Sequence, residues 1–169
     1  MSAEERKSLS EGIINGREAF VQALRDGLAL AASQGCRELC WLDADFSVWP
    51  LSEAAVLESL TRWAYPHRKL MMAAGEFESL RRRHPRFVQW RQTWDHVLQA
   101  AQYQAEDVGN GRPAGLLLAP GLFSLRLLDR DHWRAAISVR IADEIVPREW
   151  FDAVWQRSSE SFPASTLGL

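Results

Sequence analysis

Short apolar runs separated by segments of helical spacing constrain the fold of this chain more than any other feature. Residues 37–42 and 69–74 are apolar runs of strand length. Each follows a segment, residues 17–33 and 53–63, in which apolar side chains recur every three or four positions. This alternation predicts a mixed α/β sheet with helices packed on its faces. Ser52 is expected to cap the second of these helices.

The second half of the chain changes to strands in succession. Residues 116–119, 123–128 and 133–141 are predicted strands, and the last two should pair antiparallel around a turn at residues 129–131. Apolar and polar side chains alternate over residues 133–141, which predicts one apolar and one basic face. A regular doubly wound fold is therefore not expected.

A further helix is expected to start at Pro85, after a short helix over residues 76–83, because the missing proline N–H is not needed at a helix start. Apolar side chains on this helix fall within about 100° of one another and predict a stripe that faces the core. The stripe consists of Phe87, Trp90, Trp94, Val97 and Leu98. Arg91 and Asp95 form an i, i+4 pair at its edge.

The length of 169 residues fits one domain with a sufficient core. We expect residues 1–12 to be flexible, residues 13–157 to form a single α/β domain and residues 158–169 to form an extended tail. No run approaches the roughly 20 apolar residues of a membrane helix, and the N-terminal residues lack the apolar core of an export signal. We therefore expect a cytoplasmic protein without a membrane span.

The two cysteines, Cys36 and Cys40, are expected on one strand, where about 13 Å separates them. This distance is too long for a disulfide or for a shared metal ion, so both are predicted core residues. His84 and His96 would not share a helix face, and no third ligand is evident. We expect neither a metal ion nor a cofactor.

The basic segment, residues 81–96, is the most unusual part of the sequence, with five arginines, two histidines and two tryptophans. From residue 62 to residue 91, eight basic residues stand against two acidic ones, although the whole chain has a net charge of −2. Such asymmetry indicates a negatively charged partner. The candidate anion-binding residues are Arg82, Arg83, Arg86 and Arg134. The alternative is a well-packed helix with a solvated flank.

Asp43 and Asp45 are the candidate catalytic residues because strand ends are where α/β sheets place their sites. The run C-W-L-D-A-D-F-S-V resembles the first motif of haloacid dehalogenase-like phosphohydrolases. That resemblance implies a later lysine and an acidic pair. Lys69 is the only lysine beyond Lys7, and Asp143-Glu144 is a poor match for the acidic pair. The two aspartates could hold magnesium or shape a turn.

The layout of residues 17–157 resembles one half of the phospholipase D-like superfamily. The resemblance implies a His-x-Lys pair followed, after four residues, by an aspartate, with histidine as nucleophile and lysine as phosphate ligand. The string His132-Trp133-Arg134 has Val139 where the aspartate would fall, so a catalytically degenerate copy is expected. The strings D-x-D-F-x-x-W-P-L and H-P-R-F-x-x-W-R, with a terminal L-G-L, also resemble uncharacterised bacterial proteins.

These observations favour a non-catalytic binding or interaction domain with a basic anion-binding patch. Its expected partner is a phosphate-bearing ligand or another protein, and a homodimer is a further possibility. We do not expect nucleic acid as a partner, because the tryptophans of the basic segment face the core while most of its arginines do not. The alternative function is a small metal-dependent phosphate-ester hydrolase that uses Asp43 and Asp45.

Overall fold

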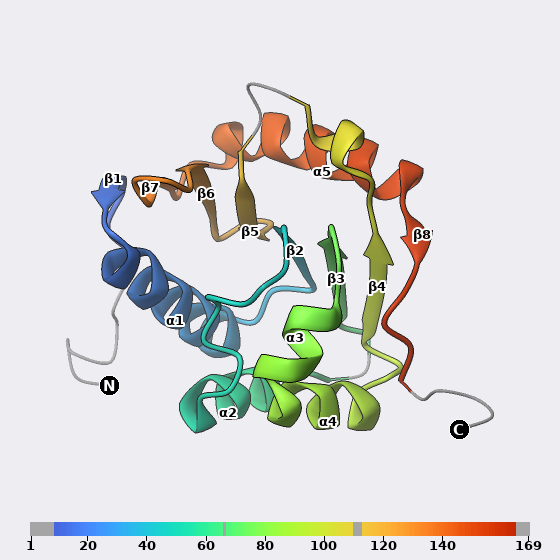
Figure 1. Cartoon of the computed structure of the whole chain (residues 1–169). Helices are drawn as coiled ribbons and strands as arrows, with labels where there is room; N and C mark the ends of the chain where they lie inside the picture. Colours follow the sequence, from blue (N-terminus) through green and yellow to red (C-terminus); the bar gives the residue numbers. More distant parts are fainter. Residues whose placement is uncertain (1–8, 66, 110–112, 165–169) are drawn as a thin grey trace.

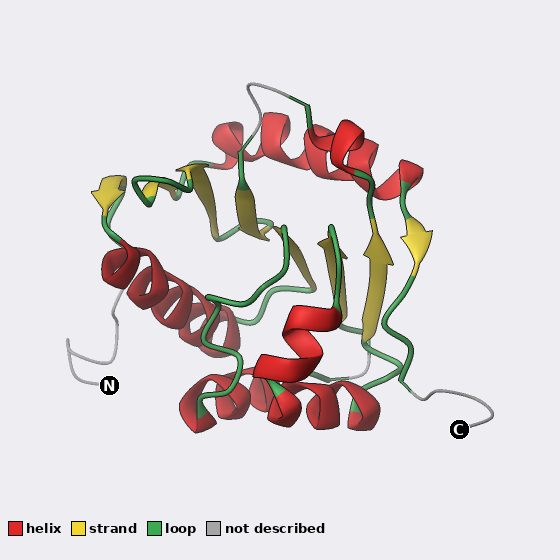
Figure 2. Cartoon of the chain, viewed as in Figure 1, coloured by secondary structure: helices red, strands yellow, loops and turns green. Residues whose placement is uncertain are grey.

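Helices and strands alternate through the first half of the chain, and antiparallel strands dominate the second half (Figures 1 and 2). The computed structural model describes residues 9–65, 67–109 and 113–164. The helices are α1 (Arg17–Gln34), α2 (Ala54–Trp63), α3 (Glu78–Arg83), α4 (Pro85–Thr93) and α5 (Ile145–Arg157), with 3-10 turns η2 (Ala105–Val108) and η3 (Ile141–Glu144). The strands are β1 (Gly12–Asn15), β2 (Glu38–Asp43), β3 (Lys69–Ala74), β4 (Leu98–Gln102), β5 (Gly115–Ala119), β6 (Phe123–Asp129), β7 (Arg134–Ser138) and β8 (Ser159–Glu160).

The described residues form one mixed sheet of eight strands in the order β1-β7-β6-β5-β2-β3-β4-β8. β2, β3 and β4 run parallel, and every other pairing is antiparallel. The predicted mixed α/β fold with helices on its faces is confirmed. The central strands β2 and β3 are buried along almost their whole length, which is why they appear in the sequence as continuous apolar runs.

Helices cover both faces of the sheet. α1 to α4 pack on one face, and α5 crosses the other (Figure 1). Alternate residues of each strand therefore enter different cores, as shown by Leu125 and Leu127 of β6 on the face that carries α1. α1 approaches β6 closely at Gly27, where a Cβ atom would lie 2.8 Å from the ring of Phe123.

The helix that starts at Pro85 is shorter than predicted. Phe87 and Trp90 are buried as expected, but α4 ends at Thr93, and the next residues form a turn. Val97 and Leu98 were placed on the helical stripe, whereas Leu98 begins β4 and pairs with Leu70 of β3. Pairing with a neighbouring strand overrides the local helical spacing, which cannot reveal such a partner.

Two smaller predictions are also corrected. The strand expected over residues 133–141 spans only Arg134–Ser138, and Val139 and Ile141 are 43% and 69% exposed. Their alternation therefore does not mark a buried strand face. Ser52 does not cap α2, because Glu53 occupies the cap position and the Ser52 hydroxyl lies 2.6 Å from Nδ1 of His84.

The segment after α5 returns to the core. β8 pairs with β4, and two residues later the side chain of Phe162 is only 1% exposed. Its ring stacks on Phe77 at a centroid distance of 5.1 Å and lies 6.4 Å from Phe87. This contact brings residues near the C-terminus against α3 and α4, the helices that carry the basic segment.

Candidate functional site

The basic segment folds as α3, the short connection at His84 and α4 (Figure 1). Arg82, Arg83 and Arg86 are exposed there. Nε of Arg82 lies 3.5 Å from a carboxylate oxygen of Glu78, but both side chains are more than half exposed, so this pair stabilises the helix little. Neither Arg83 nor Arg86 forms a salt bridge with any described residue. Their guanidinium groups are thus available to an external anion.

Two other arginines of the segment have a structural role. Arg91 is 5% exposed, and its Nε donates a hydrogen bond of 3.0 Å to the carbonyl of Phe162. Nη1 of Arg91 also lies 2.9 Å from Asp95, which confirms the predicted pair. The guanidinium of Arg81 lies 4.9 Å from the centre of the Phe162 ring, within the range of a cation–π contact. Arg81 and Arg91 therefore hold the C-terminal segment rather than a ligand.

His84 fixes the angle at which α3 meets α4. The imidazole is buried, with Nδ1 at 2.6 Å from the Ser52 hydroxyl and Nε2 at 3.0 Å from the carbonyl of Phe46. Because that carbonyl can only accept, Nε2 carries the proton. Burial lowers the pKa of His84, so the neutral ring is favoured. Arg83 and Arg86 thus project from a junction that is tied to the loop between β2 and α2.

Arg134 does not join the other candidate arginines. It is the first residue of β7, whereas Arg82, Arg83 and Arg86 lie on α3 and α4. Figure 1 shows β7 and these helices on opposite sides of the molecule. A single small anion therefore cannot bind all four residues.

The two candidate catalytic aspartates shape the loop after β2. Oδ2 of buried Asp43 accepts hydrogen bonds from the N–H groups of Asp45 and Phe46, and Oδ1 lies 2.5 Å from Arg130. Burial raises the pKa of Asp43, an effect that the charge of Arg130 opposes. Asp45 in turn accepts the N–H of Ser47 at 2.9 Å. Both oxygens of Asp43 are therefore engaged by protein groups.

The arrangement around these aspartates offers little to a metal ion. Within the part of the chain that the structure describes, no cluster of three or more histidine, cysteine, aspartate or glutamate side chains is placed to hold one. Tyr103 is near the same strand ends, and burial, together with the charge of Asp43, raises its pKa to about 12. Tyr103 is consequently a neutral neighbour and not a base at neutral pH.

Two strings in the chain resemble the His-x-Lys pair with which the phospholipase D-like pattern begins. His132-Trp133-Arg134 lies at the turn between β6 and β7, where the His132 side chain is 81% exposed and Nδ1 lies 2.7 Å from Asp129. His67-Arg68-Lys69 matches the pair literally and runs into β3. After Lys69 and four intervening residues, the aspartate position is occupied by buried Ala74. Neither string is completed by an aspartate.

No protein-family model and no curated protein sequence matches this chain. Solved structures do match in fold. The archaeal chromatin protein TrmBL2, described with a novel mode of DNA binding, matches with a TM-score of 0.60 and 10% identity over 95% of this chain and 56% of its own. This chain therefore spans little more than half the length of TrmBL2.

Two further structures match over almost their whole length. NucT from Helicobacter pylori has a TM-score of 0.57 and 4% identity, over 90% of this chain and 99% of its own. Nuc from Salmonella typhimurium, a phospholipase D family member, has a TM-score of 0.55 and 8% identity, over 90% of this chain and 97% of its own. The predicted phospholipase D-like layout is confirmed at the level of the fold.

The expectation about nucleic acid is corrected by these comparisons. That expectation rested on the prediction that the tryptophans and arginines of the basic segment do not share one surface on which bases could stack. TrmBL2 has a similar fold and binds DNA. Charged side chains bind backbone phosphates without any aromatic surface, so the lack of a stacking surface does not exclude nucleic acid. Separately, none of the described helices combines the length and apolar character needed to cross a membrane.

Proposed function

We propose that this chain is a non-catalytic binding domain of phospholipase D-like fold that binds the phosphate backbone of nucleic acid. The observation that carries the proposal is the exposed basic surface of Arg82, Arg83 and Arg86 at the junction of α3 and α4. Arg83 and Arg86 have no acidic partner among the described residues. Guanidinium groups bind phosphate oxygens through paired, charge-assisted hydrogen bonds.

The position of this surface at the start of α4 adds to its attraction for phosphate. Pro85 is the first residue of the helix, and the following N–H groups of the first turn have no helical acceptor. The positive end of the helix dipole favours negative charge at the same place. Arg83 and Arg86 flank Pro85, so side-chain charge and main-chain dipole act on one bound group.

Absence of catalysis is part of the proposal. The family resemblance implies a histidine, a lysine and an aspartate at fixed spacing, and Ala74 or Val139 stands where each string needs its aspartate. We expect no phosphodiester cleavage by the purified protein and no kinetic effect of His132→Ala or His67→Ala. Cleavage that depends on either histidine would contradict a purely binding role.

The proposal is tested by fluorescence anisotropy with a labelled DNA duplex and a labelled single strand at several salt concentrations. The variant carries Arg83→Ala together with Arg86→Ala, and Arg157→Ala on α5 is the control that removes an exposed arginine elsewhere. If each of the two arginines neutralises one phosphate, the slope of log K against log salt for duplex DNA should decrease in magnitude by about 1.8.

The affinity of the double variant at low salt should fall about tenfold or more, whereas Arg157→Ala should match the parent. An unchanged slope and affinity in the double variant would place the site elsewhere. Inorganic phosphate gives a second, independent measurement, since it should raise the melting temperature of the parent but not of the double variant.

A further inference from the structure

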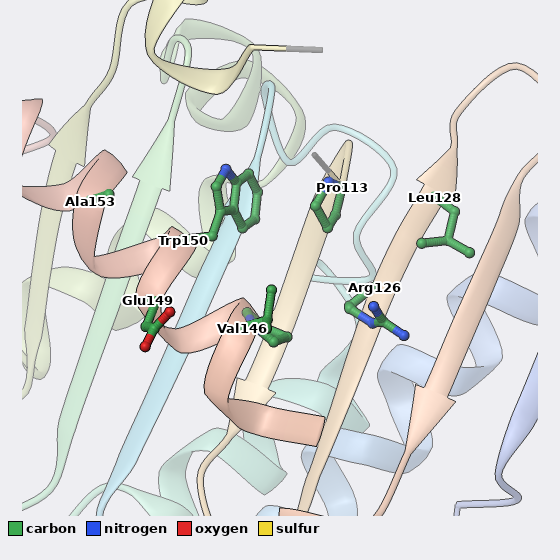
Figure 3. Close-up of a pocket in the computed structure, with 8 residues that line it drawn as sticks. Pro113, Arg126, Leu128, Val146, Glu149, Trp150 and Ala153 are labelled. Atoms are coloured by element: carbon green, nitrogen blue, oxygen red, sulfur yellow. The ribbon is translucent and has the colours of Figure 1, made fainter. Parts of the chain in front are cut away.

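A pocket of about 670 Å³ lies on the sheet face opposite the basic surface, between β6 and the first half of α5 (Figure 3). Such a volume lies in the range of small-molecule sites. Apolar and charged side chains line it together, among them Arg126, Leu128, Val146, Glu149 and Trp150.

The pocket exists because α5 covers only part of its sheet face. Trp150, Phe151 and Val154 pack over β2, β3 and β5, and together they form the smaller of the two cores. Arg126 alternates with Leu125 and Leu127, which enter the opposite core, so Arg126 lies on the α5 face. The first turn of α5 leaves Val146 71% exposed at the rim, and Leu128 is 40% exposed.

Two hydrogen-bond donors in the pocket walls have no acceptor. Nε of Arg126 and Nε1 of Trp150 are both inaccessible to solvent, and neither has a partner among the described residues. The Trp150 side chain belongs to a residue that is only 6% exposed. Both atoms face protein rather than the empty cavity, so a ligand reaches Arg126 only through the outer N–H groups of its half-buried guanidinium.

The charge of Arg126 is also uncompensated. Its guanidinium forms no salt bridge with any described residue, including Glu149, which lines the same pocket. Arginine cannot lose its proton in a protein, so Arg126 places a permanent positive charge beside the apolar walls. A neutral apolar ligand would leave that charge unpaired.

We propose that this pocket binds a small amphiphilic anion, an anionic oxygen group on an aliphatic or aromatic body. Arg126 binds the anionic oxygens through the outer N–H groups of its guanidinium. Leu128 and Val146 contact the apolar body. This site is separate from the proposed nucleic-acid surface because the sheet lies between them.

The proposal is tested by displacement of the fluorescent probe 8-anilinonaphthalene-1-sulfonate from the full chain. Octanoate and octyl phosphate should displace the probe in a saturable manner and distinguish a carboxylate from a phosphate head group. Octanol lacks the charge, and acetate lacks the apolar body, so neither should compete at the same concentration. Equal competition by octanol and octanoate, or no saturable binding by the parent, would refute the proposal.

Variants of the pocket make the test specific. Arg126→Gln should weaken octanoate binding at least tenfold. Arg157→Gln, on the exposed end of the same helix, is the matched control and should bind within twofold of the parent. Arg126→Leu should abolish binding and raise the melting temperature, because it removes an unpaired charge from apolar surroundings. Unchanged binding in Arg126→Gln, or a melting temperature of Arg126→Leu below that of the parent, would show that Arg126 serves the fold and not a ligand.

Discussion

The C-terminal segment should contribute strongly to stability through one side chain, that of Phe162. Its ring is almost completely buried, stacked on Phe77 and covered by the guanidinium groups of Arg81 and Arg91. Truncation of a buried phenylalanine to alanine costs about 3–5 kcal/mol of unfolding free energy. The upper half of that range is expected, because loss of the ring also removes an aromatic pair and two cation–π contacts.

The backbone conformation of Phe162 gives a second reason to expect a large loss of unfolding free energy. Phe162 has a φ angle of +50°, a conformation that a bulky residue rarely adopts, so the packed ring and the hydrogen bond from Arg91 must hold it there. In Phe162→Ala the strained backbone remains while the ring contacts are lost, so the segment beyond β8 should detach. Arg91 then keeps Asp95 as its partner but loses the carbonyl acceptor.

Thermal and urea unfolding followed by circular dichroism would measure the effect. For a chain of this size, each kcal/mol shifts the melting temperature by about 2–4 °C, so Phe162→Ala should lower it by about 8–20 °C. Phe162→Leu retains apolar volume and should lose less. A melting temperature of Phe162→Ala within about 2 °C of the parent would refute the packing of this segment against α3 and α4.

Two further predictions concern titratable groups. Burial lowers the pKa of His84 below its ordinary value of 6.5, so the folded state binds fewer protons than the unfolded state, and stability should fall as the pH drops through 6.5. Urea unfolding of His84→Asn between pH 7.5 and 5.5 should show a shallower pH dependence than the parent, and parallel curves would contradict this reasoning. Burial raises the pKa of Cys36 and raises that of Cys40 to about 12, so neither thiol should react with Ellman's reagent at pH 8 until guanidinium unfolds the chain. Rapid reaction of the native protein would contradict their burial.

The strands that could be predicted from the sequence are those defined by a local residue pattern. β2 and β3 are apolar on both faces because both faces are covered, and β5 and β6 flank a Pro-Gly turn. β4 and β8 could not be predicted, because each is defined by its pairing partner. β8 contributes two residues, and β4 follows a helix whose apolar spacing continues past its end. The position of Phe162 depends on contacts across more than 70 residues of sequence, which no local pattern contains.

The exposure of the basic surface could be predicted in part, and its role as an anion site stays a prediction. The helical arrangement after Pro85 correctly buried Phe87 and Trp90, and this leaves Arg83 and Arg86 on the exposed side. It could not separate Arg134 from these arginines, because the position of β7 near one edge of the sheet is set by the strand order. The string His67-Arg68-Lys69 was visible in the sequence and was overlooked, while the pocket beside Arg126 required the position of α5.

Arginine serves three different purposes in this chain, and only its surroundings distinguish them. Arg91 is buried, with an acid and a carbonyl as acceptors, so its charge is satisfied within the fold. Arg83 and Arg86 are exposed and hydrated, so an anion gains mainly by screened attraction and released counterions. Arg126 is half-buried and has no ionic partner among the described residues, so an anion in the pocket pairs with a charge that salt screens less than it screens a charge at the surface. Binding at the first surface should therefore weaken steeply with salt, whereas binding in the pocket should depend on salt much less.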